Sequence, residues 1–168
     1  LKSRITDVPD FPQPGILFRD ITTLIADGPA LKATIDAFAE RYRSMGITAV
    51  VAPESRGFIF GTPLAYALGC GMVLVRKPNK LPRATRSATY ALEYGTDTLQ
   101  IHADALGSHD RVVIIDDVLA TGGTAAAVAE LAEGCGATVV EFGFVIELDF
   151  LPGRAKLAPR AVHSLVHY

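Results

Sequence analysis

The sequence predicts an α/β fold in which helices cover both faces of a central parallel sheet. Three observations support this prediction. Short β-branched and aliphatic runs alternate along the chain with segments of helical periodicity. The helical segments 30–45 and 58–68 are each followed by a glycine, which is a common helix stop. The intervening runs are almost wholly apolar, as is typical of strands buried on both faces.

The first half of the chain contains two helix–strand alternations. Leu31, Ile35 and Phe38 recur at helical spacing and predict an amphipathic helix over 30–45. The other predicted elements of this half are a strand over 48–52, a helix over 58–68 and a strand over 72–76.

Residues 77–90 interrupt the alternation. They include two prolines and four cationic residues without apolar periodicity, so we expect a long mobile loop. Loops of this length are often functional. The elements predicted after the loop are hairpin strands over 90–94 and 98–102, a central strand over 112–116, a helix over 122–133, and strands over 138–148 and 162–168.

Composition narrows the class of protein. A chain of 168 residues buries enough surface for one domain, so we expect a single domain over 1–168. No run approaches the roughly 20 apolar residues of a membrane span, and no secretory signal is visible, which predicts a soluble protein without a membrane partner. The formal net charge of −2 argues against a nucleic-acid partner. Two cysteines without a C-x-x-C pair favour a reducing, cytoplasmic location.

The most informative segment, 112–124, has the sequence VVIIDDVLATGGT. It combines a buried strand, two acids at the carboxyl end of that strand, a turn of small residues and the start of a helix. Ligands of open parallel sheets bind beyond the carboxyl ends of the strands. The free N–H groups at a helix start favour an anion, and Asp116 and Asp117 can accept hydrogen bonds from sugar hydroxyls. We therefore expect a site for a phosphate joined to a polyol, although the segment is neither a Walker loop nor G-x-G-x-x-G.

This segment closely resembles the phosphoribosyl-diphosphate signature of the type I phosphoribosyltransferases. Further segments resemble the adenine phosphoribosyltransferases within that family, in the same order and at similar spacing. They are FPQPGILFRDIT at 11–22, PESRGF at 53–58, RKPNKLP at 76–82, LEYG at 92–95 and GRAKL at 153–157. Two departures are Thr23, where many members have proline, and Ala155, which interrupts a commoner Arg-Glu-Lys. The resemblance covers nearly the whole chain and implies the type I phosphoribosyltransferase fold, with a small N-terminal hood over 1–28 and a flexible catalytic loop over 77–94.

The resemblance also implies an activity. The expected enzyme is a glycosyltransferase (pentosyltransferase) of purine salvage that moves the phosphoribosyl group of 5-phosphoribosyl 1-diphosphate onto adenine, giving AMP and diphosphate. The implied cofactor is Mg²⁺, held mainly by diphosphate and ribose oxygens rather than by protein ligands, and the implied assembly is a homodimer. The alternatives are a different acceptor base, a non-catalytic regulator that binds nucleic acid, and a structural domain without a site.

Donor-site residues follow from the same resemblance. Asp116 and Asp117 would hold the ribose hydroxyls, and Arg56 with Lys77 or Lys80 would meet the diphosphate. The residues implied for the 5-phosphate are Ala120, Thr121, Gly122, Gly123 and Thr124. One alternative is that Arg56 pairs with Glu54. The other is that the lysines, like Arg83 and Arg86, are solvated loop charges.

The resemblance places adenine between Phe18, which would stack on the ring, and Leu148, with hydrogen bonds from the backbone of Leu17 and Arg19. Glu93 would hydrogen-bond the purine at N7 and act in proton transfer. The alternatives are that Phe18 and Leu148 are core residues and that Glu93 is an exposed strand residue. Two further site expectations concern Tyr94, which would help close the loop, and His163 and His167, which alternate as in a strand and predict no metal site.

Overall fold

The computed structural model describes residues 1–91 and 95–168. In chain order its elements are η1 (Lys2–Arg4), β1 (Thr6–Pro9), β2 (Leu17–Asp20), α1 (Thr22–Ala26), α2 (Gly28–Tyr42), β3 (Ala49–Pro53), α3 (Arg56–Leu68), β4 (Gly71–Val75), β5 (Thr85–Ala91), β6 (Thr96–His102), β7 (Arg111–Leu119), α4 (Gly123–Gly134), β8 (Thr138–Glu147), α5 (Gly153–Leu157) and β9 (Val162–His167).

The central sheet has five strands in the order β4-β3-β7-β8-β9, and all neighbouring pairs are parallel. Ile114 at the middle of β7 pairs with Val51 of β3 on one side and Phe142 of β8 on the other. All five residues of β3 are buried, which explains the uninterrupted apolar run in the sequence. The predicted α/β class is therefore confirmed.

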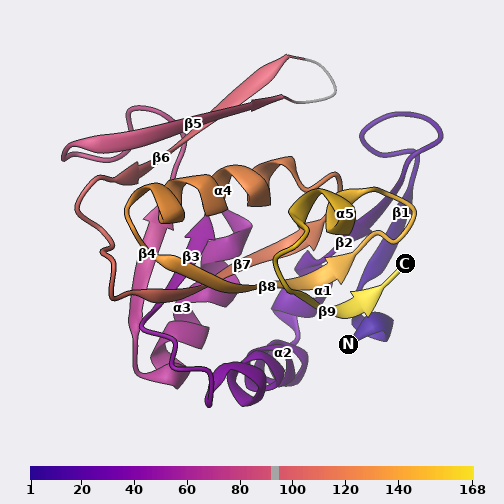
Figure 1. Ribbon diagram of the computed structural model, residues 1–168. Coiled ribbons are helices and arrows are strands. Elements are labelled where there is room, and N and C mark those ends of the chain that lie inside the picture. The colour runs from indigo at the N-terminus through magenta and orange to yellow at the C-terminus, as the bar shows by residue number, and fades with distance from the viewer. Residues whose placement is uncertain (92–94) are drawn as a thin grey trace.

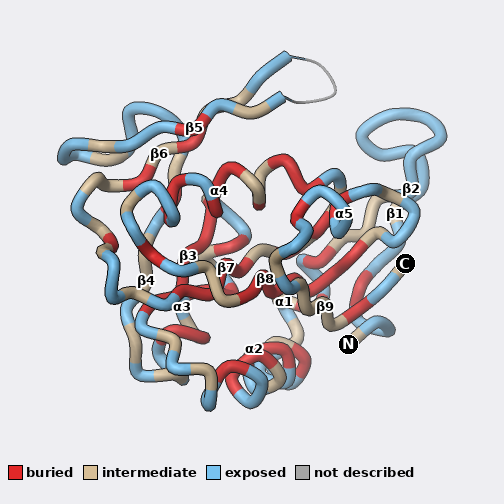
Figure 2. The backbone as a smooth tube through the Cα atoms, viewed as in Figure 1, coloured by how far each residue is buried: buried red, intermediate tan, exposed pale blue. Residues whose placement is uncertain are grey.

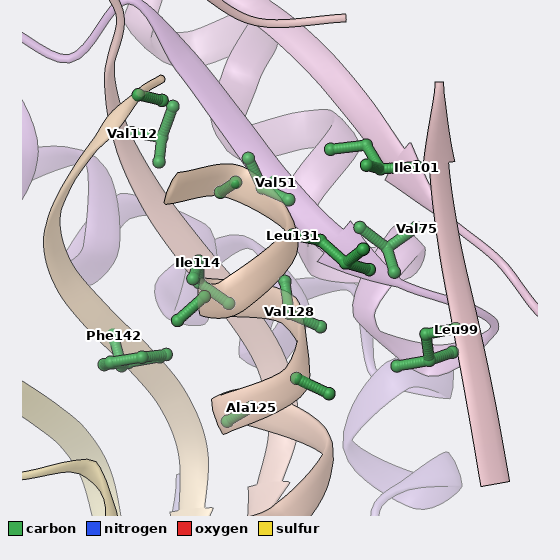
Figure 3. Packing of buried hydrophobic residues seen from close by; sticks show 14 of the residues in the cluster. Val51, Val75, Leu99, Ile101, Val112, Ile114, Ala125, Val128, Leu131 and Phe142 are labelled. Atoms are coloured by element: carbon green, nitrogen blue, oxygen red, sulfur yellow. The ribbon is translucent and has the colours of Figure 1, made fainter. Parts of the chain in front are cut away.

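Helices cover the sheet on both faces (Figure 1). On one face α4 packs Ala125, Val128 and Leu131 into a cluster with Val51 and Ile114 of the strands (Figure 3). On the other face α2 and α3 form a second cluster. Of the helices in the described part of the chain, none combines the length and apolarity that a membrane span requires.

The hairpin of β5 and β6 lies beyond α4, outside the central sheet (Figure 1). It contributes Ala88, Leu99 and Ile101 to the α4 cluster. The prediction of an irregular loop over 77–90 is wrong for its second half, because β5 already begins at Thr85. Cross-strand backbone hydrogen bonds hold this strand, and of its seven residues Ala88 alone is buried, so the sequence shows no apolar periodicity there.

A small two-stranded sheet follows the N-terminus, where β1 pairs antiparallel with β2 from Thr6–Asp20 to Pro9–Leu17. It lies within the segment 1–28, for which the resemblance implies a hood, and the sequence pattern did not predict these strands or α1. The short α5 was also missed. Neither β1 nor β2 contains a buried residue, and α1 and α5 are only five residues long, so neither an apolar run nor a helical period marks these elements in the sequence.

Candidate active site

A cavity of about 410 Å³ opens at the carboxyl end of β7. Its walls come from three parts of the chain: the hood strand β2 with the residues around it, the β7–α4 connection, and the end of β8. The lining residues are Ile16, Leu17, Phe18, Arg19, Asp20, Ile21, Thr22, Arg56, Asp116, Asp117, Val118, Leu119, Ala120, Thr121, Gly122, Gly123, Thr124, Ala125, Phe144 and Leu148. Its size suits a small organic ligand.

The turn from Ala120 to Gly122 leads directly into α4. Gly122 has φ +80°, a backbone conformation that favours glycine, and its carbonyl accepts the N–H of Ala126 at 3.0 Å. No side chain caps the start of α4 within the described structure. The first N–H groups of a twelve-residue helix are thus available to an anion in the cavity.

Asp116 and Asp117 stand where β7 ends. Asp117 is buried and forms an ion pair with Arg56, while its backbone N–H donates to Asp116 Oδ1 at 2.9 Å. Burial and the neighbouring Asp117 carboxylate raise the pKa of Asp116 well above its ordinary value. The Asp117 carboxylate raises the pKa of Arg56. This site therefore holds two adjacent acids, and only one of them has a strong cationic partner.

The alternative pairing of Arg56 with Glu54 is wrong. Glu54 instead accepts hydrogen bonds from the Lys77 backbone N–H at 2.6 Å and from Arg76 and Lys80 at 3.1 and 3.2 Å. These contacts lower the pKa of the Glu54 carboxyl against the opposing effect of burial. Pairing across 61 residues, as between Arg56 and Asp117, cannot be inferred from local spacing.

A second, polar hollow of about 590 Å³ adjoins the first cavity. The two share Arg56, Asp116, Asp117 and Thr124. The further lining residues of the second hollow are Glu54, Ser55, Lys77, Lys80, Tyr90, Asp97 and Leu99. Lys77 and Lys80 are therefore brought to the site together with Arg56. Each of these lysines pairs with a carboxylate that also lines the hollow, Asp97 for Lys77 and Glu54 for Lys80. Arg83 lines neither cavity and pairs with the exposed Asp104.

Sequence reasoning missed two residues at this hollow. Asp97 Oδ2 accepts a hydrogen bond from Lys77 Nζ at 2.9 Å, and this contact lowers the pKa of Asp97 and raises the pKa of Lys77. The Tyr90 hydroxyl accepts a hydrogen bond from Thr124 Oγ1 at 3.3 Å and so connects the hairpin to the phosphate turn. The only available signal was that Tyr90 lies within the expected catalytic loop and Asp97 lies shortly after it. Glu93 and Tyr94 lie outside the described residues.

The four residues expected to bind adenine all line the first cavity. Phe18 is part of neither apolar cluster and meets Phe11 edge-on with ring centroids 5.1 Å apart, so the core alternative does not describe it. Leu148 lines the cavity and also packs against the α2–α3 cluster. The Arg19 side chain pairs with Asp7 at 2.5 Å, and its guanidinium carbon lies 3.9 Å from the centroid of the Tyr168 ring.

Among the described residues, Glu147, Asp149 and His167 lie close enough together that their side chains could ligate one metal ion. Glu147 already accepts hydrogen bonds from Arg154 and Ser164, so its oxygens are occupied. His163 and His167 both lie in β9, as the alternating pattern predicted.

The fold and the site are those of a phosphoribosyl transferase domain, and the family model of that description matches residues 22–160. The chain is 58% identical over 168 residues to the adenine phosphoribosyltransferase of Acaryochloris marina, covering all of this chain and 99% of the relative. It belongs to the adenine phosphoribosyltransferases.

Solved structures agree with this assignment. The adenine phosphoribosyltransferase of Thermoanaerobacter pseudethanolicus superposes with a TM-score of 0.96 at 49% identity, over 99% of this chain and 97% of that one. The Saccharomyces cerevisiae enzyme, solved with adenine and an imino-altritol bisphosphate, gives 0.93 at 44% identity over 98% and 96%. The predicted type I fold, the class of enzyme and the adenine phosphoribosyltransferase activity are therefore confirmed.

Proposed function

We propose that, in making AMP and diphosphate from adenine and 5-phosphoribosyl 1-diphosphate, the chain holds the donor across the wall shared by the two cavities. One observation carries this assignment of the site: Asp116, Asp117 and Thr124 border both the cavity under the hood and the cationic hollow. The phosphate, the sugar and the diphosphate of the donor match, in order, the 120–124 turn, the paired acids and the cationic hollow.

The donor would be held in three places. Backbone N–H groups of the 120–124 turn and the Thr124 hydroxyl bind the 5-phosphate, and Asp116 and Asp117 accept hydrogen bonds from the ribose hydroxyls. Arg56, Lys77 and Lys80 face the diphosphate. Their present carboxylate partners are Asp117, Asp97 and Glu54, so donor binding exchanges these ion pairs for phosphate contacts.

The base would lie in the part of the cavity under β2. Phe18 stacks on the purine, Leu148 covers the opposite side, and the backbone of Leu17 and Arg19 reads the base edge. Polar backbone groups discriminate because adenine and hypoxanthine present opposite hydrogen-bond roles at C6. The proposed roles of Glu93 in proton transfer and Tyr94 in closing the loop rest on the family resemblance.

The reaction forms a bond from a ring nitrogen of adenine to the anomeric carbon of ribose, breaks the bond from that carbon to a diphosphate oxygen, and releases one proton from the base, whose transfer is the role proposed for Glu93. Positive charge develops on the ribose in the transition state, and the carboxylates of Asp116 and Asp117 stabilise it. Arg56 and the lysines stabilise the negative charge that accumulates on the leaving diphosphate. No covalent nucleophile is required of the protein.

We propose Mg²⁺ as the cofactor. The acids at the donor site are engaged with each other and with Arg56, which suits an ion held mainly by diphosphate and ribose oxygens and water. When bound, it neutralises diphosphate charge. The residues nearest to such an ion would be Asp116 and Asp117.

We also propose a homodimer in a reducing, cytoplasmic compartment. Ile59 and Tyr66 of α3 and Leu74 of the edge strand β4 expose large apolar side chains, with Tyr66 89% exposed, and a second copy would bury them. Cys70 and Cys135 are both free thiols. Light scattering tests the assembly, and the variant Tyr66→Glu is expected to shift it toward monomer.

Residues 77–91, which include strand β5, are proposed to move together with β6 and to close over bound donor. Amide hydrogen exchange across 77–91 tests this proposal with the empty enzyme and with a donor analogue plus Mg²⁺. Exchange that slows only with ligand is expected. Equally slow exchange in both states would contradict a closing loop.

A panel of bases tests the activity as a whole. Adenine, hypoxanthine, guanine, xanthine and orotate are each incubated with 5-phosphoribosyl 1-diphosphate and Mg²⁺, and the nucleotide product is measured. We expect AMP from adenine as the dominant product. Preferential formation of another nucleotide would assign the chain to a different acceptor, and no product at all would contradict the proposed function.

A further inference from the structure

The proposed function assigns no role to one motif of the sequence. The segment GRAKL at 153–157 forms α5, which lies beside the start of α4 and the end of β7 (Figure 1). None of its residues lines either cavity. Its contacts with the phosphate turn, however, are unusually close.

At the start of α5, the backbone of Gly153 packs directly against the backbone of the 120–122 turn. A Cβ atom built on Gly153 would lie 2.3 Å from the Ala120 carbonyl oxygen and 2.8 Å from Leu119 Cδ1. A Cβ atom on Gly122 would lie 2.9 Å from the Gly153 carbonyl oxygen. Glycine is thus required on both sides of the contact, and α5 supports the turn from behind without an intervening side chain.

An ion pair anchors α5 in this position. Arg154 donates from Nε and Nη2 to the two carboxylate oxygens of Glu147 at 2.8 and 2.5 Å, and from Nη1 to the Val162 carbonyl at 3.0 Å. Glu147 is 4% exposed and also accepts the Ser164 hydroxyl at 2.6 Å. Such a bidentate pair restrains the residue next to Gly153 in both distance and orientation.

The pair also links α5 to the sheet. Glu147 is the last residue of β8, and the following Leu148 donates its N–H to the Leu119 carbonyl at the end of β7, 3.0 Å away. The ends of β7 and β8, the phosphate turn and α5 are therefore connected by direct contacts. A shift of Arg154 would be transmitted to Ala120 and Gly122.

We propose that Glu147 and Arg154 are positioning residues for the donor phosphate: their ion pair holds Gly153 against the 120–122 turn and keeps the turn in the shape that receives the 5-phosphate. This inference rests on the proposed function. It predicts that weakening the pair reduces affinity for the phosphate end of the donor more than affinity for adenine.

The test measures binding of ribose 5-phosphate by calorimetry, together with KM for the donor and for adenine. Arg154→Met is expected to weaken ribose 5-phosphate binding and raise the donor KM by about tenfold each, equivalent to about 1.4 kcal/mol, while the adenine KM changes less than about twofold. Arg154→Lys keeps the charge and should recover part of the affinity. Gly153→Ala disturbs the same contact sterically and should reproduce the donor defect with the ion pair intact.

Arg160 supplies a matched control. It forms a bidentate pair with Glu133 at 2.8 and 2.7 Å, remote from the turn, so Arg160→Met should leave ribose 5-phosphate affinity within about twofold of the wild type. Circular dichroism confirms that each variant is folded. If Arg154→Met does not fold, Arg154→Lys and Gly153→Ala provide the same comparison.

The outcomes separate the two proposals. Wild-type protein that does not bind ribose 5-phosphate would contradict the proposed phosphate site and, with it, this inference. Wild-type binding that persists unchanged in Arg154→Met and Gly153→Ala would overturn the positioning role alone. An equal rise in both KM values would also overturn it, since it would indicate general distortion of the enzyme.

Discussion

The donor and acceptor halves of the site differ in how the fold supports them. Asp116 and Asp117 lie near the carboxyl end of β7, the central strand of the sheet, and the 120–122 turn follows that strand directly. The largely buried helix α4 comes next in the chain (Figure 2). Three of the residues proposed to bind the base, Leu17, Phe18 and Arg19, lie on the two-stranded sheet, which we call the hood. At and beside the start of β2, Phe11, Ile16 and Leu17 are 50, 39 and 48% exposed. The donor half is therefore fixed by the core, whereas the acceptor half has few supporting contacts and can adjust when the base binds.

The largest expected effect concerns the rigid half. Replacing both acids, Asp116→Asn with Asp117→Asn, removes transition-state stabilisation and should reduce turnover by about a thousandfold or more. Steady-state assays measure the loss, and circular dichroism checks that the fold is retained. Near-wild-type turnover in the folded double variant would show that the donor lies elsewhere.

The next effect tests the hood. Hypoxanthine and guanine carry an oxo group where adenine carries an amino group, so they would leave polar groups of the pocket without a hydrogen-bond partner. Each unpaired group costs roughly 1–3 kcal/mol of binding free energy. We expect kcat/KM for adenine to exceed that for hypoxanthine or guanine by at least about a hundredfold with the same donor. Comparable values for hypoxanthine would mean that the hood does not select the base.

A smaller effect is expected from one aromatic residue. Phe18→Ala removes the proposed stacking surface, and we expect the adenine KM to rise about tenfold, or about 1.4 kcal/mol, with little change in the donor KM. Phe150→Ala is the matched control, because Phe150 is 73% exposed and does not line the cavity. A donor KM that rises in parallel would remove the distinction between the two halves.

The smallest effect is one of stability. The pKa of Asp116 is higher in the folded protein than in the unfolded chain. As pH increases, this carboxyl therefore ionises first in the unfolded chain, and the free energy of unfolding decreases. Asp116→Asn lacks this penalty. We expect Tm at pH 8 to rise by about 2–4 °C, the equivalent of about 1 kcal/mol in a domain of this size.

The stability gain should largely vanish near pH 3, where the acid is protonated in the folded state and mostly protonated in the unfolded state as well. Asp36→Asn on the exposed face of α2 serves as the control and should show no such gain at pH 8. A lower Tm for Asp116→Asn at pH 8 would indicate that the ionised carboxylate stabilises the empty enzyme.

The same contrast explains what could be predicted from the sequence. The donor half was predictable because strand, acids, turn and helix start are contiguous over 112–124, and each part has a local chemical signal. The hood was recognised only by resemblance, since β1 and β2 are four residues each and owe their conformation to one another. The Arg56–Asp117 pair and the contact of Gly153 with Ala120 join distant residues, and no periodicity encodes such contacts.

The shared wall between the two cavities also has a consequence for inhibitor design. Because Asp116, Asp117 and Thr124 border both spaces, fragments seated on either side lie close enough to be joined by a short linker. Joining them makes the second binding event intramolecular, and the combined affinity can exceed that of either fragment by about 10²–10⁴. Resistance substitutions in this wall would change residues that we propose to take part in the reaction, so we expect them to reduce the enzyme's own activity as well as the affinity for the linked compound.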